Sequence, residues 1–167
     1  RLGRILGVVF LLFALLVVNS IYLVIITVLE QTSGEIYQDY FYMLMFLIHL
    51  IMGLLLTLPV ILFGLGHMRR AFGRPNRYAV RAGIALFSMS LVLLLTGLVL
   101  TRFDFFEVND PQVRSIAYWL HVASPLAVAW LFVLHRLAGP PIRWRTARNW
   151  SLVAAGFAAV MIGSSAM

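Results

Sequence analysis

The sequence predicts an all-α integral membrane protein, a helical bundle with five transmembrane helices. Of its 167 residues, 62% are hydrophobic and only 11% are charged, against about 25% charged in an ordinary soluble domain. Five apolar stretches each approach the ~20 residues that a helix needs to cross the hydrocarbon core. Short polar segments with turn-forming Gly, Pro and Asn separate them, which leaves little chain for a soluble domain.

The five helices are expected, in order, at roughly residues 5–29, 40–66, 80–101, 115–136 and 149–166. Because short connections join antiparallel neighbours, we expect the first four helices to form one bundle over residues 5–136. A loop and the fifth helix follow over residues 137–167. This last helix is rich in Ala and Gly, a composition suited to close packing on a partner or to tethering an outer domain.

The charges are divided between alternate loops. All six acidic residues lie on one side, and eleven of the 13 arginines lie on the other: Arg1, Arg4, Arg69, Arg70, Arg74, Arg77, Arg81, Arg136, Arg143, Arg145 and Arg148. The positive-inside rule then predicts a cytoplasmic N-terminus and a C-terminus on the outer, periplasmic side. Since topology accounts for the net charge of +7, no nucleic-acid partner is expected.

Four histidines lie on two of these helices, His49 and His67 on the second and His121 and His135 on the fourth. At ~100° per residue, a separation of 18 residues is a whole number of turns and one of 14 falls ~40° short of four turns, so each pair shares a helix face. Ionisable side chains inside membrane helices usually face the bundle interior and mark ion paths, proton relays or cofactors.

The second and fourth helices run in the same direction, so their histidines pair at two depths. We expect His49 to pair with His121 near the outer face and His67 with His135 at the inner ends, each pair ligating one haem. The separations differ, since 18 residues rise ~27 Å and 14 residues rise ~21 Å. Pro59 and Pro125 lie between the histidines of their helices, so we expect kinks or unequal helix tilts to absorb the difference.

Gly83 and Gly97 of the third helix are also 14 residues apart, at the depths of the two expected haems. Glycine allows a helix backbone to approach a flat ring, although small residues are also common wherever membrane helices pack closely. The chain contains no cysteine, so the haems would be held noncovalently, without a CxxCH attachment or an iron–sulfur cluster.

Two histidine-bearing helices with a 14-residue pair, and the glycine pair between them, resemble the N-terminal four-helix module of the cytochrome b and b6 family over residues 5–136. The resemblance implies two stacked b haems ligated by His49, His67, His121 and His135, with Gly83 and Gly97 packing on the rings. The chain departs from the family in three ways: it has Ser20 where the first helix would carry an outer glycine, a longer ligand spacing in the second helix, and no PEWY sequence.

The chain is therefore more similar to a quinone-linked b-type subunit of a larger respiratory or photosynthetic complex in the bacterial inner membrane. Such a subunit transfers electrons between the quinone pool and a periplasmic redox protein such as a c-type cytochrome, and contacts other membrane subunits. No motif places a quinone site. Two alternatives remain open: a haem-free membrane anchor or assembly subunit, and a proton-coupled transporter, which the absence of an acid within any span disfavours.

Arginines near the two depths are candidate donors to the anionic haem propionates. Arg102 and Arg114 lie on the outer side, against the charge bias. On the inner side, where topology alone explains arginine, the candidates are Arg70, Arg81 and Arg136.

Overall fold

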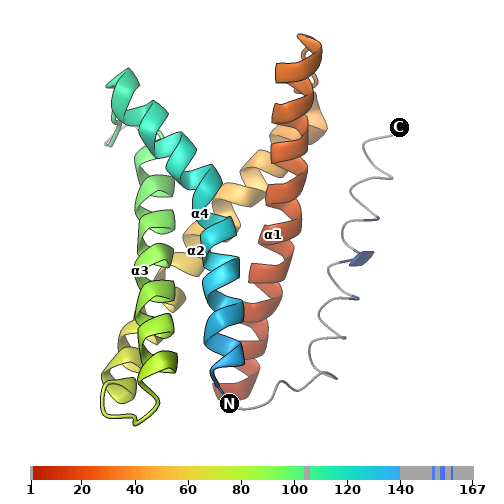
Figure 1. The fold of residues 1–167 in the computed structure, drawn as a ribbon. Coiled ribbons are helices and arrows are strands. Elements are labelled where there is room, and N and C mark those ends of the chain that lie inside the picture. Colours follow the sequence, from red (N-terminus) through yellow and green to blue (C-terminus); the bar gives the residue numbers. More distant parts are fainter. Residues whose placement is uncertain (1, 104–105, 140–151, 153–154, 157–158, 160–167) are drawn as a thin grey trace. The chain divides into compact units, whose positions relative to one another are not determined.

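A computed structural model describes residues 2–103 and 106–139, together with residues 152, 155, 156 and 159. This part of the chain forms four long helices (Figure 1): α1 (Leu2–Ser33), α2 (Tyr40–Ala71), α3 (Arg77–Leu100) and α4 (Pro111–Leu137). It contains no β-strand, only an isolated bridge between Phe103 and Phe106. The all-α prediction is confirmed. The predicted number of five helices is not matched, and the fifth, at residues 149–166, lies almost wholly outside the described residues.

All four helices are long and apolar enough to cross a membrane. Large apolar side chains remain exposed along them, including Leu126 (76%), Trp130 (65%) and Leu58 (63%). A helix satisfies its own backbone hydrogen bonds, so lipid can surround such side chains without leaving any backbone N–H or C=O group unpaired. The chain is therefore a multi-pass membrane protein.

The helices begin and end at residues suited to those positions. Asp110 caps α4, its carboxylate accepting hydrogen bonds from the backbone N–H groups of Gln112 and Val113 at 2.9 Å each. Asp39 accepts from the N–H of Tyr42 at 2.8 Å at the start of α2. Gly34 follows α1 with a φ of 74°, a left-handed conformation that glycine adopts without steric cost.

The contacts of the chain divide it into two compact units, and the division falls inside α2. Among the described helices, the first unit holds α1 and the part of α2 up to Leu56. There, Tyr22 and Phe41 pack edge to face with ring centres 5.5 Å apart. The second unit begins at Thr57 and contains the rest of α2 with α3 and α4. Pro59, which lacks the N–H needed for the helical ladder, lies just past this boundary.

Within the second unit, α3 and α4 pack closely side by side and run in opposite directions (Figure 1). Asn76 joins their ends: its side chain caps α3 by accepting from the N–H of Ala79 at 3.1 Å, and it donates to the carbonyl of Ala138 at 2.8 Å. At Gly64 of α2, an added Cβ would lie 2.1 Å from the ring of Phe87. Only glycine fits against that ring.

Candidate functional site: histidines held by backbone carbonyls

The first histidine site, the His121 site, joins α4 to α3. His121 Nδ1 lies 3.1 Å from the carbonyl oxygen of Leu93, and the imidazole Cε1 lies 3.0 Å from the position of a Cβ built on Gly97. In a helix, the carbonyl of residue 93 faces residue 97, which is four positions later. Without a side chain at Gly97, the imidazole reaches the second lone pair of that carbonyl.

The His135 site repeats this arrangement. His135 Nδ1 lies 3.1 Å from the carbonyl oxygen of Ala79, and its Cε1 lies 3.0 Å from the Cβ position of Gly83. Gly83 again follows the accepting residue by four positions. The imidazole, the glycine and the carbonyl of one site are each 14 residues from their counterparts in the other, so the antiparallel α3–α4 pair carries the same structure twice.

These contacts determine the tautomer of both imidazoles. A carbonyl oxygen only accepts, so the Nδ1 atoms of His121 and His135 must carry their protons and donate. In a neutral imidazole the lone pair then belongs to Nε2. A histidine whose Nδ1–H is fixed by a carbonyl has the form in which metal-ligating histidines usually occur.

A third site, the His49 site, lies within the first unit. His49 Nδ1 is 3.2 Å from Asn19 Oδ1 and 3.4 Å from Ser20 Oγ. The Asn19 side chain is fully buried, and its Nδ2 donates to the Met45 carbonyl at 3.0 Å, so its Oδ1 faces the imidazole as an acceptor. His49 therefore also carries its proton on Nδ1. Ser20, noted in the sequence as a departure from glycine, lies directly beside this imidazole.

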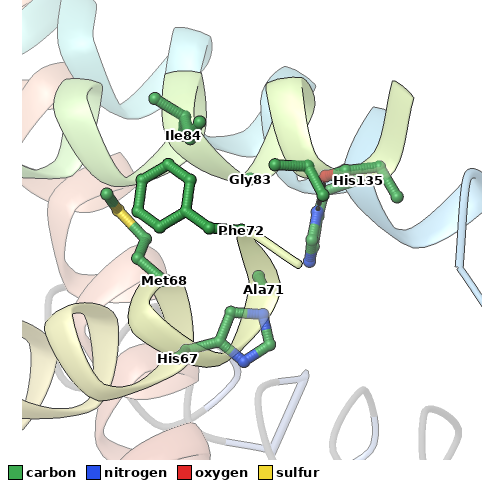
Figure 2. Close-up of a pocket in the computed structure, with 9 residues that line it drawn as sticks. His67, Met68, Ala71, Phe72, Gly83, Ile84 and His135 are labelled. Carbon is green, nitrogen blue, oxygen red and sulfur yellow. Dashed lines mark hydrogen bonds between the residues drawn. The ribbon is translucent and has the colours of Figure 1, made fainter. Parts of the chain in front are cut away.

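His67, on the last turns of α2, completes the set within the second unit. Its ring stacks on Phe63 with centres 5.6 Å apart. Its centre lies 6.0 Å from that of His135, and the two ring planes are nearly perpendicular at 83°. Figure 2 shows both imidazoles directed into one space, with Gly83 close to His135. The structure thus brings together the predicted inner pair.

Two adjoining hollows occur at this pair. One of about 260 Å³ is lined by His67, Arg74, Asn76 and His135 with small apolar residues, close to the ~300–1,000 Å³ of small-molecule pockets. The other, of about 20 Å³, lies against Gly83 and Phe72 (Figure 2) and has room for about one water molecule. Arg74 lines the larger hollow, but the sequence analysis did not include it among the candidate arginines.

The His67–His135 pair supplies two imidazoles, the type of donor that ligates haem iron. Their ring centres lie 6.0 Å apart in an edge-to-face contact. No group of three or more His, Cys, Asp or Glu side chains able to hold an ion occurs among the described residues, but axial ligation of haem needs only two. The cavity is narrower than a porphyrin.

The two members of the predicted outer pair belong to different units, His49 to the first and His121 to the second. Their joint ligation of one haem therefore stays a prediction.

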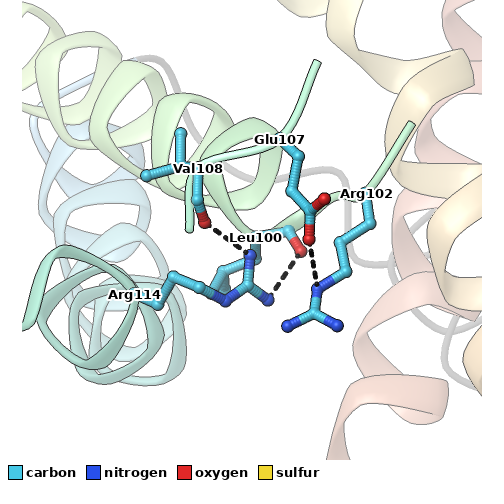
Figure 3. Close-up of polar contacts among 5 residues, drawn as sticks. All are labelled: Leu100, Arg102, Glu107, Val108 and Arg114. Carbon is cyan, nitrogen blue, oxygen red and sulfur yellow. Dashed lines mark hydrogen bonds and ion pairs between the residues drawn. The ribbon is translucent and has the colours of Figure 1, made fainter. Parts of the chain in front are cut away.

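The two arginines predicted for the outer side, Arg102 and Arg114, make contacts where α3 connects to α4 (Figure 3). Arg114 donates to the carbonyls of Val108 and Leu100 at 3.3 Å each, and Arg102 forms an exposed ion pair with Glu107 at 3.3 Å. On the other side of the second unit, Arg70 Nε donates to the Gly66 carbonyl of its own helix at 3.0 Å. The role of these three residues, and of Arg81 and Arg136, as propionate donors stays a prediction.

Sequence reasoning missed the residues that hold the imidazoles. Asn19 and Thr96 are both buried in apolar helices, and each contacts an imidazole Nδ1. A buried polar side chain in a membrane helix is costly without a partner, so Asn19, within an apolar run, was a usable signal. For the carbonyls of Ala79 and Leu93, the only sequence signal was indirect: a glycine four positions after each of them.

The chain matches no protein-family model, no curated protein and no solved structure.

Proposed function

We propose that the chain is a membrane-bound di-haem b-type cytochrome that transfers electrons across the bacterial inner membrane between the quinone pool and a periplasmic redox partner. It acts as one subunit or domain of a larger electron-transport complex. In this proposal the N-terminus is cytoplasmic, the C-terminus is periplasmic, and the fifth predicted helix, residues 149–166, contacts a partner or tethers an outer domain.

The repeated imidazole arrangement on α3 and α4 carries the proposal. Two histidines of one helix each donate Nδ1–H to a carbonyl beside a glycine, at sites 14 residues apart. A structural histidine in a membrane helix needs one satisfying contact, but it does not need a glycine opposite it or a copy at the same spacing. Two ligands of identical construction, about 21 Å apart along one helix, are what two haems on opposite sides of a bilayer require.

When bound, haem iron supplies a one-electron Fe(II)/Fe(III) couple. The chain's own residues hold and orient it. His67 and His135 would provide Nε2 ligands to one haem, and His49 and His121 are the candidate ligands of the other. The carbonyls of Ala79 and Leu93 and the amide of Asn19 keep three of these imidazoles protonated on Nδ1. Arg74 lines the larger cavity at this pair and would neutralise a haem propionate near the membrane–water interface.

The test is the haem content of the full chain, purified in mild detergent from cells with haem available. A pyridine haemochrome assay and a reduced-minus-oxidised spectrum should give two b haems per chain. His121→Ala and His135→Ala should each remove one, whereas Ser90→Ala, which alters a hydroxyl bonded to its own helix at the Leu86 carbonyl, should retain both. Haem-free wild-type protein would refute the proposal.

One alternative has a specific observation in its favour. Three of the four imidazoles already make hydrogen bonds to protein oxygen atoms, as interior polar groups of a haem-free anchor or assembly subunit would. Under this alternative, His121→Ala lowers the stability of the α3–α4 pair and no variant changes the visible spectrum.

A further inference from the structure

The two imidazoles of the His67–His135 pair are held differently. His135 donates its Nδ1–H to the carbonyl of Ala79 at 3.1 Å. The His67 imidazole makes ring contacts instead: it stacks on Phe63, with centres 5.6 Å apart, and meets the edge of His135 at 6.0 Å. Neither of its nitrogens forms a hydrogen bond to the part of the chain that the structure describes. The described residues therefore fix the tautomer of His135 and leave that of His67 unset.

The helices that carry the pair differ in the same way. His135 lies on α4, which packs closely along α3, and its acceptor Ala79 belongs to that neighbouring helix. His67 lies on the last turns of α2, and Phe63, on which it stacks, is one turn earlier on the same helix. The stack therefore moves with α2 and does not tie His67 to α3 or α4. A hydrogen bond between helices restrains His135, and packing alone restrains His67.

The space beside His67 is a cavity. The hollow of about 260 Å³ adjoins both imidazoles, and most of its other lining residues are small and apolar. Asn76 also lines it, but its side-chain oxygen and nitrogen are already bonded to the Ala79 N–H and the Ala138 carbonyl. Arg74 is the lining residue that carries a full charge. Since a water molecule needs about 10–15 Å³ of such space, the hollow has room for a diatomic molecule.

From these differences we infer that His67 is the exchangeable axial ligand of the haem at this pair, and that a small neutral diatomic ligand such as carbon monoxide binds the iron in its place. The inference rests on the proposed function. A metal-ligating histidine usually donates its other N–H to an oxygen, and loss of that contact typically weakens metal binding by about 10–100-fold. His135 has such a contact and is the fixed ligand. Steric access and polarity on the ligand face decide whether a haem only transfers electrons or also binds small molecules.

The exchange requires no other reactant. The bond between Fe(II) and His67 Nε2 breaks, and a bond between Fe(II) and the carbon atom of carbon monoxide forms. His67 leaves as a neutral imidazole, and no electron or proton is transferred. The mostly apolar lining of the cavity favours a neutral ligand, because a charged one would lose its hydration there.

The test is carbon monoxide binding to the reduced holoprotein, measured as a reduced-plus-CO minus reduced spectrum. One of the two haems should bind the ligand. His67→Ala should retain that haem in a high-spin, five-coordinate form that is half-saturated at a lower CO concentration, and added imidazole should return it to the low-spin form. His135→Ala should lose the same haem. The matched control is His121→Ala, which should remove the other haem and leave CO binding intact.

The wild-type spectrum by itself can overturn the inference, without any substitution. If the protein contains two haems and neither binds carbon monoxide, His67 is not exchangeable, although the cytochrome proposal stands. The inference is also wrong if CO binding disappears in His121→Ala, because the reactive haem would then be the other one. Equal haem loss in His67→Ala and His135→Ala, with unchanged helix content by circular dichroism, would contradict the distinction between a fixed and an exchangeable ligand.

A second readout does not need haem. In the full chain labelled with ¹⁵N-histidine, NMR reports the tautomer of each imidazole. His135 should occur as a single Nδ1–H tautomer, and His67 as a mixture of both tautomers whose ring N–H exchanges rapidly with water. His67→Ala and His135→Ala assign the two signals. A single fixed tautomer at His67 would refute the difference in anchoring. Wild-type protein without haem would refute the cytochrome proposal and the ligand exchange together, and these signals would then decide the anchoring alone.

Discussion

Replacing Gly97 by alanine tests whether the glycine is there to let His121 reach a backbone carbonyl. The added methyl group would lie 3.0 Å from His121 Cε1 and 3.4 Å from Nδ1. Carbon atoms pack best at about 3.5–4.0 Å, so the imidazole must withdraw from α3 by roughly 0.5 Å. Its bond to the Leu93 carbonyl, now 3.1 Å, would then approach the ~3.6 Å at which a contact no longer counts as a hydrogen bond.

The energetic terms give a net loss of stability. Overpacking a tight contact costs about 1–3 kcal/mol, and the weakened hydrogen bond costs up to about 0.5–1.5 kcal/mol. The higher helix propensity of alanine offsets about 1 kcal/mol of this loss of stability. We therefore expect Gly97→Ala to lower the free energy of unfolding by roughly 0.5–3.5 kcal/mol, the sum of the terms for overpacking, the hydrogen bond and propensity.

Reversible unfolding in mixed detergent micelles, followed by circular dichroism, measures this difference. Gly53→Ala is the matched control, since an added Cβ there meets no atom within 4 Å and only the propensity gain should appear. Gly83→Ala should resemble Gly97→Ala, because its Cβ would lie 3.0 Å from His135 Cε1. Equal stability of Gly97→Ala and Gly53→Ala would show that His121 does not need a glycine at position 97 to reach the Leu93 carbonyl.

Three further variants test the packing around the sites. In Gly64→Ala, the added Cβ would lie 2.1 Å from the Phe87 ring, which should destabilise the protein by about 1–3 kcal/mol. In a double-mutant unfolding cycle, Phe87→Leu should restore part of this stability. Additive effects of the two substitutions would contradict a direct clash. Asn76→Ala removes both the α3 cap and the hydrogen bond to Ala138. It should lower the free energy of unfolding by about 0.5–2 kcal/mol in the same assay, and an unchanged free energy would refute this expectation. Arg114→Gln removes the hydrogen bonds to the Val108 and Leu100 carbonyls and should speed amide hydrogen exchange in the α3–α4 loop. The control, Arg102→Gln, breaks only an exposed ion pair worth about 0–1 kcal/mol. Equal exchange rates in the two variants would contradict the role of Arg114.

Much of the fold could be predicted because lipid imposes simple requirements on a chain. A helix that satisfies its own backbone and is long enough to cross the hydrocarbon core reveals itself by composition alone, and the four described helices overlap their predicted ranges. Helical periodicity also placed His121 and His135 on one face, together with a glycine pair at the same spacing. The Nδ1 contacts at Gly83 and Gly97 are consistent with that register, although the sequence analysis assigned the glycines to a porphyrin rather than to the imidazoles.

What the sequence by itself determined is the all-α membrane class, the helix order and the spacing of the four histidines, because these depend on local hydrophobicity and on the pitch of one helix. Only the tertiary structure decided which atoms hold each imidazole. Every residue has a backbone carbonyl, so the sequence does not mark those of Ala79 and Leu93 as the acceptors. The buried acceptors Asn19 and Thr96 become partners of His49 and His121 only when α1 packs on residues 40–56 of α2, and α3 on α4. A hydrogen bond between helices depends on their relative rotation and distance, which no single helix encodes.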